Sequence, residues 1–395
     1  MKVLVLICII LHCSIDFIES TGFDEDYINL IMENAWKTNE KMTNFTAEPR
    51  SLKDFFYCNT FVSTSPRPTN VHALRPNDIE YIGAVGDSLT AANGAKASTI
   101  LGLIEECRGV SWSMGGERPD LSESITLPNI IKKFNPNLYG ASTGSGGSTS
   151  VNAVFNMARP GETSFEMLAQ AKNLVYKMKQ TSGINFSQGW KLVTMFVGGN
   201  DLCKACRDSK YTAANYMKNI RAALDYLKAN LPRTLVNLVV SLDVSGIEIL
   251  TGLTCRNMQK TFCDCGLSSS FRPSLLSFTQ EIQQQTEDLI HSGVYDTSED
   301  FTVVAHPFMK NMRPPTKPDG SGDYSYFAPD CFHFSIKGHE AAAVELWNSM
   351  LTPVGKKSDK WASLNQAIRC PSSDSPFIFT NKNSPNILKN LLKNY

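Results

Sequence analysis

The chain has no excess of charge of either sign, because 38 Lys and Arg residues are balanced by 38 Asp and Glu residues. No run of like charges marks a tail, and no basic tract resembles the footprint of a nucleic-acid-binding domain. After the N-terminus, no stretch is apolar for long enough to form a transmembrane helix. Internal repeats are also absent. The hydrophobic content of 42% is that of an ordinary globular protein, and we expect no nucleic-acid partner.

The N-terminus predicts a secretory signal peptide over residues 1–20. A basic residue, Lys2, precedes the apolar segment Val3–Leu11, which is too short to span a bilayer comfortably. Cleavage after Cys13-Ser14 or after Ser20-Thr21 fits the pattern equally well. The C-terminal residues Ile387–Tyr395 are too polar for a lipid-anchor signal. We therefore expect a soluble product that is secreted or lumenal.

Cysteine usage agrees with an oxidising compartment, where disulfides are the default. Of 11 cysteines, two lie in the predicted leader, which leaves nine. The nine are Cys58, Cys107, Cys203, Cys206, Cys255, Cys263, Cys265, Cys331 and Cys370. An odd number predicts one thiol that is free or pairs between chains. A structural disulfide explains the Cys203–Cys206 motif better than a redox or zinc site, because Cys263–Cys265 has the wrong spacing for a usual second ligand pair.

Two sequons, Asn44-Phe45-Thr46 and Asn185-Phe186-Ser187, predict N-glycosylation on surface loops.

The order of apolar and helical segments predicts an α/β domain. From residue 79 onward, apolar strands alternate with helices, which is typical of a mostly parallel sheet covered on both faces. The predicted strands are 79–85, 191–197, 235–242 and 301–306, and the predicted helices are 91–107, 163–178, 213–229, 274–290 and 337–350. Residues 110–150 lack periodicity, which favours a functional loop or an irregular cover. We divide the chain into the leader, an N-terminal wrap at 21–76 with a helix around 24–36, a catalytic domain at 77–352 and a C-terminal extension at 353–395.

Ser88 is the candidate nucleophile. It lies in Gly86–Thr90, directly after the apolar run Ile82–Val85, so it falls at the carboxyl end of a predicted strand. Ligand sites of α/β sheets lie at this edge. A serine hydroxyl needs a base and a residue that orients the base. Asp330 and His333 are spaced to share a tight turn, where the carboxylate holds Nδ1–H and leaves Nε2 for the serine.

Two loops offer donors for an oxyanion. Asn200 follows Gly198-Gly199 after a predicted strand, so its side-chain amide can reach the same edge. Gly161 ends the block Asn156–Gly161 before a predicted helix, and its N–H can approach a ligand without obstruction by a Cβ.

Together these four blocks resemble the GDSL, or SGNH, hydrolases. The blocks occur in the family's order as Gly86-Asp87-Ser88-Leu89, Asn156-x-Ala158-x-x-Gly161, Gly198-x-Asn200-Asp201 and Asp330-x-x-His333. The resemblance covers residues 79–351, and the segments 111–116 and 134–140 further resemble the phospholipase B branch. It implies a three-layer α/β/α sandwich and ester hydrolysis without a metal or other cofactor. It also implies that Ser88, His333 and Asp330 form the triad, and that the Ser88 N–H joins Gly161 and Asn200 in the oxyanion hole.

One rival nucleophile is Ser142, because Gly140–Gly144 fits the G-x-S-x-G elbow of α/β-hydrolases. That elbow needs a strand before it and a helix directly after it, and neither neighbour fits here. Among the other histidines, we interpret His306 as a core or loop residue and His339 as a packing or surface residue.

Three functions remain open at this stage. The first is a secreted serine esterase acting on phospholipids and lysophospholipids, with transient contact to a membrane or micelle surface. The second is an esterase for short-chain or carbohydrate-linked acyl groups, since one triad supports many substrates. The third is a non-catalytic lipid-binding protein on a hydrolase fold.

Overall fold

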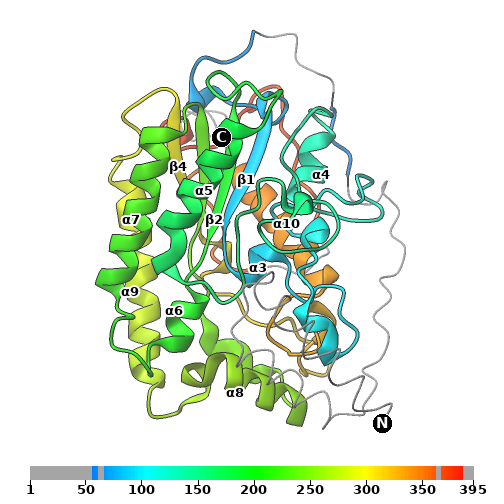
Figure 1. Cartoon of the computed structure of the whole chain (residues 1–395), viewed down its shortest axis with the longest axis vertical. Coiled ribbons are helices and arrows are strands. Elements are labelled where there is room, and N and C mark those ends of the chain that lie inside the picture. The colour runs from blue at the N-terminus through cyan, green and yellow to red at the C-terminus, as the bar shows by residue number, and fades with distance from the viewer. Residues whose placement is uncertain (1–55, 61–65, 362–365, 386–395) are drawn as a thin grey trace, which may run out of the picture.

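The computed structural model describes residues 56–60, 66–361 and 366–385. The predicted leader, the predicted helix around 24–36, the Asn44 sequon and the tail 387–395 lie outside these residues. The helices are α3 (Ser88–Ala91), α4 (Leu127–Lys132), α5 (Met167–Gln180), α6 (Gly199–Lys204), α7 (Ala213–Asn230), α8 (Leu253–Leu267), α9 (Arg272–His291) and α10 (Ile336–Met350), labelled as in Figure 1.

A parallel sheet forms the centre of the molecule. Within the described residues it has four strands in the order β1-β2-β3-β4, namely Tyr81–Gly86, Lys191–Phe196, Thr234–Val239 and Phe301–His306. Every residue of these strands is buried, which explains why they are continuous apolar runs rather than alternating ones. Isolated parallel bridges at Tyr139 and Asn156 extend the sheet beyond β1.

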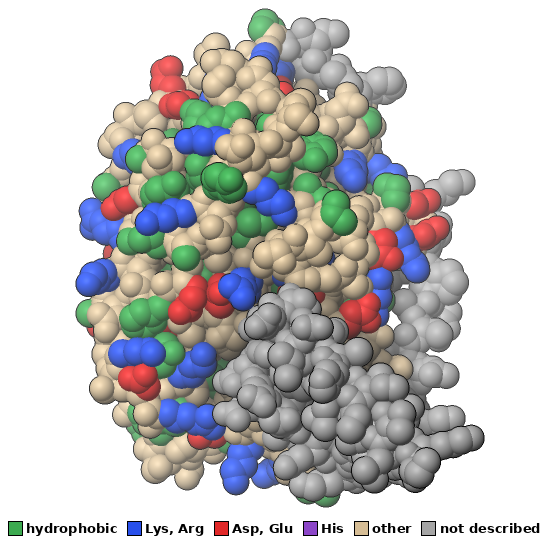
Figure 2. Space-filling model, viewed as in Figure 1, with side chains coloured by type: hydrophobic (Ala, Val, Ile, Leu, Met, Phe, Trp, Pro, Cys, Tyr) green, Lys and Arg blue, Asp and Glu red, His purple; other side chains and the backbone are tan. Residues whose placement is uncertain are grey.

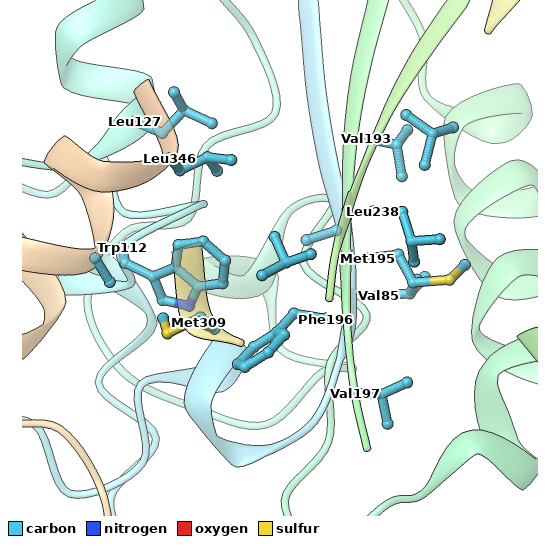
Figure 3. Close-up of a cluster of buried hydrophobic side chains, with 14 of the residues drawn as sticks. Val85, Trp112, Leu127, Val193, Met195, Phe196, Val197, Leu238, Met309 and Leu346 are labelled. Atoms are coloured by element: carbon cyan, nitrogen blue, oxygen red, sulfur yellow. The ribbon is translucent and has the colours of Figure 1, made fainter. Parts of the chain in front are cut away.

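Helices cover both faces of the sheet, which makes the three-layer α/β/α sandwich that the sequence predicts. Val193, Met195 and Val197 point from β2 and its end to one face, whereas Phe196 points to the other and meets Trp112 (Figure 3). On the first face α5 packs closely on β1, and α7 and α9 continue that layer (Figure 1). On the second face α10 packs against α4 and β4.

Gly83 is what allows α5 to approach β1 so closely. A Cβ built at this position would lie 3.0 Å from the tips of Leu174 and of Met178, two buried side chains of α5. Such a contact is tight, so the tips of these two side chains would have to move by a few tenths of an ångström.

Most predicted elements are confirmed, and the exceptions lie near the carboxyl edge of the sheet. The predicted strands and the helices α5, α7, α9 and α10 match to within a few residues. The helix predicted over 91–107 is wrong, since α3 ends at Ala91 and the chain continues through a 3₁₀ turn at Ile100–Ile104. Ala92 has φ of 59°, a left-handed conformation that stops the helix. The helices α4, α6 and α8, the last of 15 residues, are not among the predicted elements.

Disulfides tie the periphery to this core. The described residues contain Cys58–Cys370, Cys203–Cys263, Cys206–Cys265 and Cys255–Cys331, and Cys107 is their free, buried cysteine. The Cys203–Cys206 motif is thus structural, but its two cysteines belong to different disulfides: Cys203 in α6 and Cys206 just after α6 are each joined to α8. Cys58–Cys370 links the wrap to the C-terminal extension, whose residues Ile378 and Phe379 are buried.

The surface carries no broad region of one charge on the face seen in Figure 2, where basic and acidic side chains alternate. Of the helices that the structure describes, none is both long and apolar enough to cross a membrane.

Candidate active site

Ser88 lies at the carboxyl edge of β1, as the sequence predicts, and is the first residue of the short helix α3. Asp87 caps this helix, because its Oδ1 accepts from the Leu89 N–H at 3.0 Å. Gly86 permits the sharp turn, since a Cβ there would lie 2.6 Å from the Phe196 carbonyl and 2.7 Å from the Thr90 hydroxyl. Burial raises the pKa of the Asp87 carboxyl to about 7.

The carbonyls of α3 are held by three donors from distant segments. Ser111 Oγ and Asn156 Nδ2 donate to the Thr90 carbonyl at 2.7 and 3.0 Å, and Trp112 Nε1 donates to the Leu89 carbonyl at 3.1 Å. A four-residue helix is too short to satisfy its own backbone groups. Ser111, Trp112 and Asn156 therefore fix the helix that carries Ser88.

His333 reaches Ser88 from a turn that precedes α10. His333 Nε2 lies 2.8 Å from Ser88 Oγ, and His333 Nδ1 lies 2.5 Å from Asp330 Oδ2. Asp330 is fully buried, and the other two side chains are 4% and 6% exposed. The three residues thus form a continuous hydrogen-bonded chain in the order that general-base activation of a serine requires.

Asn200 and Gly161 are the predicted oxyanion donors, and Asn200 lies in the first turn of α6 whereas Gly161 lies in the loop before α5. Asn200 lines the cavity beside Ser88, and its Nδ2 donates to the Glu162 carbonyl at 2.8 Å, which leaves a second amide hydrogen. Gly161 is the residue before Glu162 and has φ of 76°, so a side chain there would strain the backbone. Gly161 is exposed and is not one of the residues that line the cavity.

A largely apolar cavity of about 620 Å³ opens beside Ser88. Its wall comes from the carboxyl ends of β1, β2 and β3, from the 3₁₀ helix Val244–Ile249 (η8) and from the loops after β4 and before α10. The apolar lining residues are Leu89, Leu242, Val244, Ile247, Leu250, Met312, Pro314, Phe327, Phe332 and Phe334. The reactive serine therefore lies against a surface that suits a hydrocarbon chain.

The rival assignment at Ser142 is wrong. Its side chain is fully buried, and its Oγ donates to the Ala153 carbonyl at 2.8 Å. No helix follows it directly, since the next residues run through bends and turns. His306 and His339 are both buried, so of the predicted alternatives the core position holds for His306 and the packing position for His339. His306 bonds Asn237 and Ser349 at the end of β4, and burial lowers the pKa of His339 to about 3.

Sequence reasoning missed several residues that hold the site. Gln170 of α5 receives the Gly86 N–H and donates to the Gly86 carbonyl, both at 2.7 Å, and so secures the end of β1. Arg108, fully buried and paired with Glu106, donates to the Asn156 and Ala158 carbonyls. Asp201 accepts from the Ser164 backbone and hydroxyl. Gln170 could have been noticed in the sequence, because it is a polar residue at a helical position where apolar residues are expected.

Among the described residues, one trio has metal-ligand atoms close together, namely Cys206, Asp264 and Cys265. The two sulfurs are bonded to each other, so neither is available as a thiolate ligand.

A Ser–His–Asp chain at the carboxyl edge of a parallel α/β/α sheet defines a serine hydrolase. The chain belongs to the GDSL-like lipase/acylhydrolase family, whose model matches residues 82–346, and it is accordingly a carboxylic ester hydrolase. The matched region covers the four strands of the sheet almost completely and includes Ser88, Asp330 and His333.

The chain is also similar to curated mammalian proteins. It is 44% identical over 329 residues to membrane-associated phospholipase B1 of Mus musculus and of Homo sapiens, and 42% identical to that of Rattus norvegicus. Each match covers 80% of this chain but only 22–23% of the relative. The chain thus spans about a fifth of the length of these relatives.

Proposed function

We propose that this chain hydrolyses the acyl esters of phospholipids and lysophospholipids through an acyl-enzyme. The observation that carries the proposal is the Ser88–His333 contact of 2.8 Å at the edge of an apolar cavity. The relatives named phospholipase B1 support a phospholipid substrate.

In the proposed reaction, Ser88 Oγ attacks the ester carbonyl carbon while His333 Nε2 takes the hydroxyl proton. Asp330 holds the Nδ1 side of the ring and stabilises the imidazolium that forms. Collapse of the tetrahedral intermediate breaks the carbon–oxygen bond to the alcohol, and His333 returns the proton to that alcohol. A water molecule, deprotonated by His333, then attacks the acyl-enzyme. Collapse of the second tetrahedral intermediate breaks the bond to Ser88 Oγ and releases the fatty acid, while His333 returns the proton to Ser88 Oγ.

The negative oxygen of each intermediate needs donors that are already in place. We assign this role to the backbone N–H groups of Ser88 and Gly161 and to the Asn200 side chain. The free amide hydrogen of Asn200 and its position in the cavity lining support its share. Gly161 directly precedes Glu162, whose carbonyl accepts from Asn200 Nδ2, and this proximity to the Asn200 side chain supports the backbone donor.

We further propose that the protein is secreted, is glycosylated at Asn44 and Asn185, and meets its substrate by transient contact with a membrane or micelle surface. The disulfides favour an oxidising compartment. Asn185 lies exposed on a turn after α5, where a glycan has room.

The test is incubation of the purified protein with mixed phospholipid and lysophospholipid vesicles, followed by product analysis by mass spectrometry. We expect free fatty acid together with lysophospholipid and glycerophosphodiester, with Ser88→Ala as the inactive control. Hydrolysis of short-chain esters without any release from vesicles would favour the small-ester alternative. Failure on a broad ester panel would favour the non-catalytic one.

A further inference from the structure

One face of α8 contacts the turn that carries Asp330 and His333. Cys255, Gln259 and Phe262 are spaced by four and three residues, so they lie on the same side of the helix. Cys255 forms the disulfide with Cys331, which lies between Asp330 and His333 in the sequence. The Phe262 ring packs edge-on against His333, with ring centroids 5.7 Å apart.

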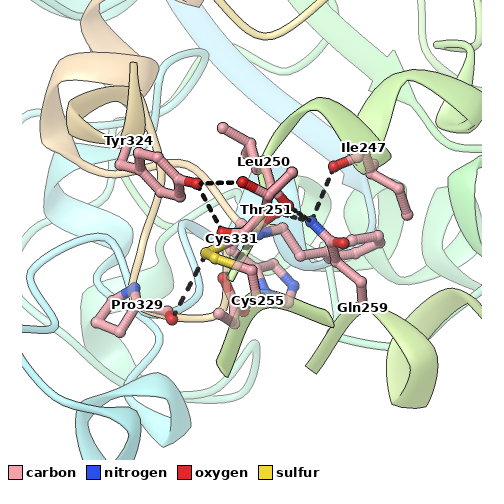
Figure 4. Close-up of a disulfide and its surroundings, with 11 residues drawn as sticks. Ile247, Leu250, Thr251, Cys255, Gln259, Tyr324, Pro329 and Cys331 are labelled. Carbon is pink, nitrogen blue, oxygen red and sulfur yellow. Dashed lines mark hydrogen bonds and ion pairs between the residues drawn. A yellow bond between two sulfur atoms is a disulfide. The ribbon is translucent and has the colours of Figure 1, made fainter. Parts of the chain in front are cut away.

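Gln259 joins this turn to the wall of the cavity. Its Nε2 donates to the carbonyls of Ile247 at 2.9 Å, Leu250 at 3.2 Å and Cys331 at 3.4 Å (Figure 4). Ile247 and Leu250 line the cavity, and the Gln259 side chain is fully buried. Two amide hydrogens shared among three carbonyls therefore connect the cavity wall and the catalytic turn through a single side chain.

The turn needs such support because its backbone is unfavourable at Cys331. This residue has φ of 56°, a left-handed conformation that a residue with a Cβ adopts at a cost. A conformation of this kind persists where its surroundings hold it. α8 contacts Cys331 through two of its residues. Cys255 forms a disulfide with the Cys331 sulfur, and Gln259 donates to the Cys331 carbonyl.

We propose that Gln259 is a positioning residue of the hydrolytic reaction. Through the Cys331 carbonyl and the cavity wall, it keeps the 330–333 turn at the place from which His333 reaches Ser88. This inference rests on the proposed role of His333 as the base. Because a displacement of about 1 Å in a reacting group can cost about a hundredfold in rate, the effect should appear in kcat.

The test replaces Gln259 by methionine, which keeps the length of the side chain and removes its donors. The matched control is Asn129→Leu in α4, at the other end of the molecule from α8 (Figure 1). Asn129 is also fully buried and also donates to two backbone carbonyls, those of Arg118 and Ser124. Both variants are compared with the wild type by thermal denaturation and by kcat and KM on p-nitrophenyl acetate and p-nitrophenyl decanoate.

We expect kcat of Gln259→Met to fall about tenfold to a hundredfold on both esters, with KM within about twofold of the wild type. The rate of labelling by a fluorophosphonate, which reports the Ser88–His333 pair without any ester, should fall in proportion. Asn129→Leu should lose similar thermal stability and keep kcat within about twofold. If Gln259→Met does not fold, Gln259→Asn, which is one methylene too short to reach all three carbonyls, is compared in the same way.

Two results would overturn the inference. In the first, the Gln259 variant keeps the wild-type kcat and raises KM on the decanoate alone, which would show that Gln259 only shapes the cavity wall. In the second, Asn129→Leu loses as much kcat as the Gln259 variant. A wild type that hydrolyses neither ester would instead contradict the proposed function, and the labelling rates would still decide the role of Gln259.

Discussion

The Asp330 carboxylate contacts His333 at two points. Its Oδ2 lies 2.5 Å from His333 Nδ1, and its Oδ1 accepts from the backbone N–H of His333 at 3.0 Å. The same Oδ1 accepts from the Phe332 N–H at 3.0 Å. One carboxylate thus shapes the turn and orients the imidazole, which explains why an Asp-x-x-His spacing can place a base and its partner together.

Asp330→Asn separates these two tasks. The amide oxygen can still accept from the backbone of the turn, but its NH₂ group cannot accept the Nδ1–H that the proposed base carries. We expect kcat to fall about 10⁴-fold, as it does where the same change selects the wrong tautomer in a serine protease, with KM little changed. Steady-state kinetics measure the loss. A variant that keeps more than a tenth of the wild-type kcat would contradict the assigned role.

Ser88→Ala should abolish activity and labelling by a fluorophosphonate. Loss of the nucleophile of a serine triad costs about 10⁶-fold in kcat. Ser142→Ala is the matched control, because Ser142 is also a buried serine two residues after a glycine. We expect it to lose about 1 kcal/mol of stability with the Ala153 hydrogen bond and to retain kcat. Activity that survives the first change and disappears with the second would reverse the assignment.

The sequence predicts the fold and the reactive residues where the signal is local. The strands are apolar runs, and Ser88 follows one of them, so its place at the carboxyl edge of the sheet could be inferred. The helix over 91–107 is wrong because the left-handed Ala92 ends α3, and no residue type marks that conformation. The roles of Gln259 and Gln170 could not be predicted, since their acceptors lie up to 84 residues away along the chain.

The folded protein should lose stability as the pH rises from about 4 to about 7, partly because of Asp87. Burial raises the pKa of its carboxyl from 3.8 to about 7, so in this range the unfolded chain has already released a proton that the folded chain retains. The contribution of Asp87 to stability is therefore greatest below pH 4 and is lost by pH 7.

Asp87→Asn should remove this part of the pH dependence while keeping the helix cap to Leu89, because asparagine is also a good N-cap residue. Relative to the wild type, the variant should gain roughly 2–3 kcal/mol of unfolding free energy between pH 5 and pH 8. Urea denaturation at the two pH values measures the difference. A gain that is equal at both would show that Asp87 titrates at its ordinary pKa in the folded protein.

Asn200→Ala should lower kcat by about a hundredfold to a thousandfold, the usual effect of removing one oxyanion donor, and leave KM nearly unchanged. The change also removes the bond to the Glu162 carbonyl, so a control for that loss is needed. Asn152→Ala supplies it, since Asn152 Nδ2 donates to the Ser145 carbonyl at 2.9 Å and does not line the cavity. If Asn200→Ala and Asn152→Ala have comparable kcat, Asn200 is not an oxyanion donor.

Ile247→Trp tests whether the apolar cavity holds the acyl chain. The Ile247 side chain lines the cavity, and its backbone carbonyl accepts from Gln259, so an enlarged side chain fills the cavity without removing that hydrogen bond. The volume of about 620 Å³ would then shrink from the η8 side. A short acyl group still fits beside the serine, whereas a long one meets the indole.

We therefore expect kcat/KM on p-nitrophenyl decanoate to fall at least about tenfold, because each buried methylene that is displaced forfeits about 0.8 kcal/mol of transfer free energy. On p-nitrophenyl acetate it should stay within about twofold. The matched control is Ile249→Trp, which changes a partly buried isoleucine of the same 3₁₀ helix outside the cavity lining. Equal losses on both esters in the Ile247 variant, or a loss on the decanoate in the control, would place the acyl chain elsewhere.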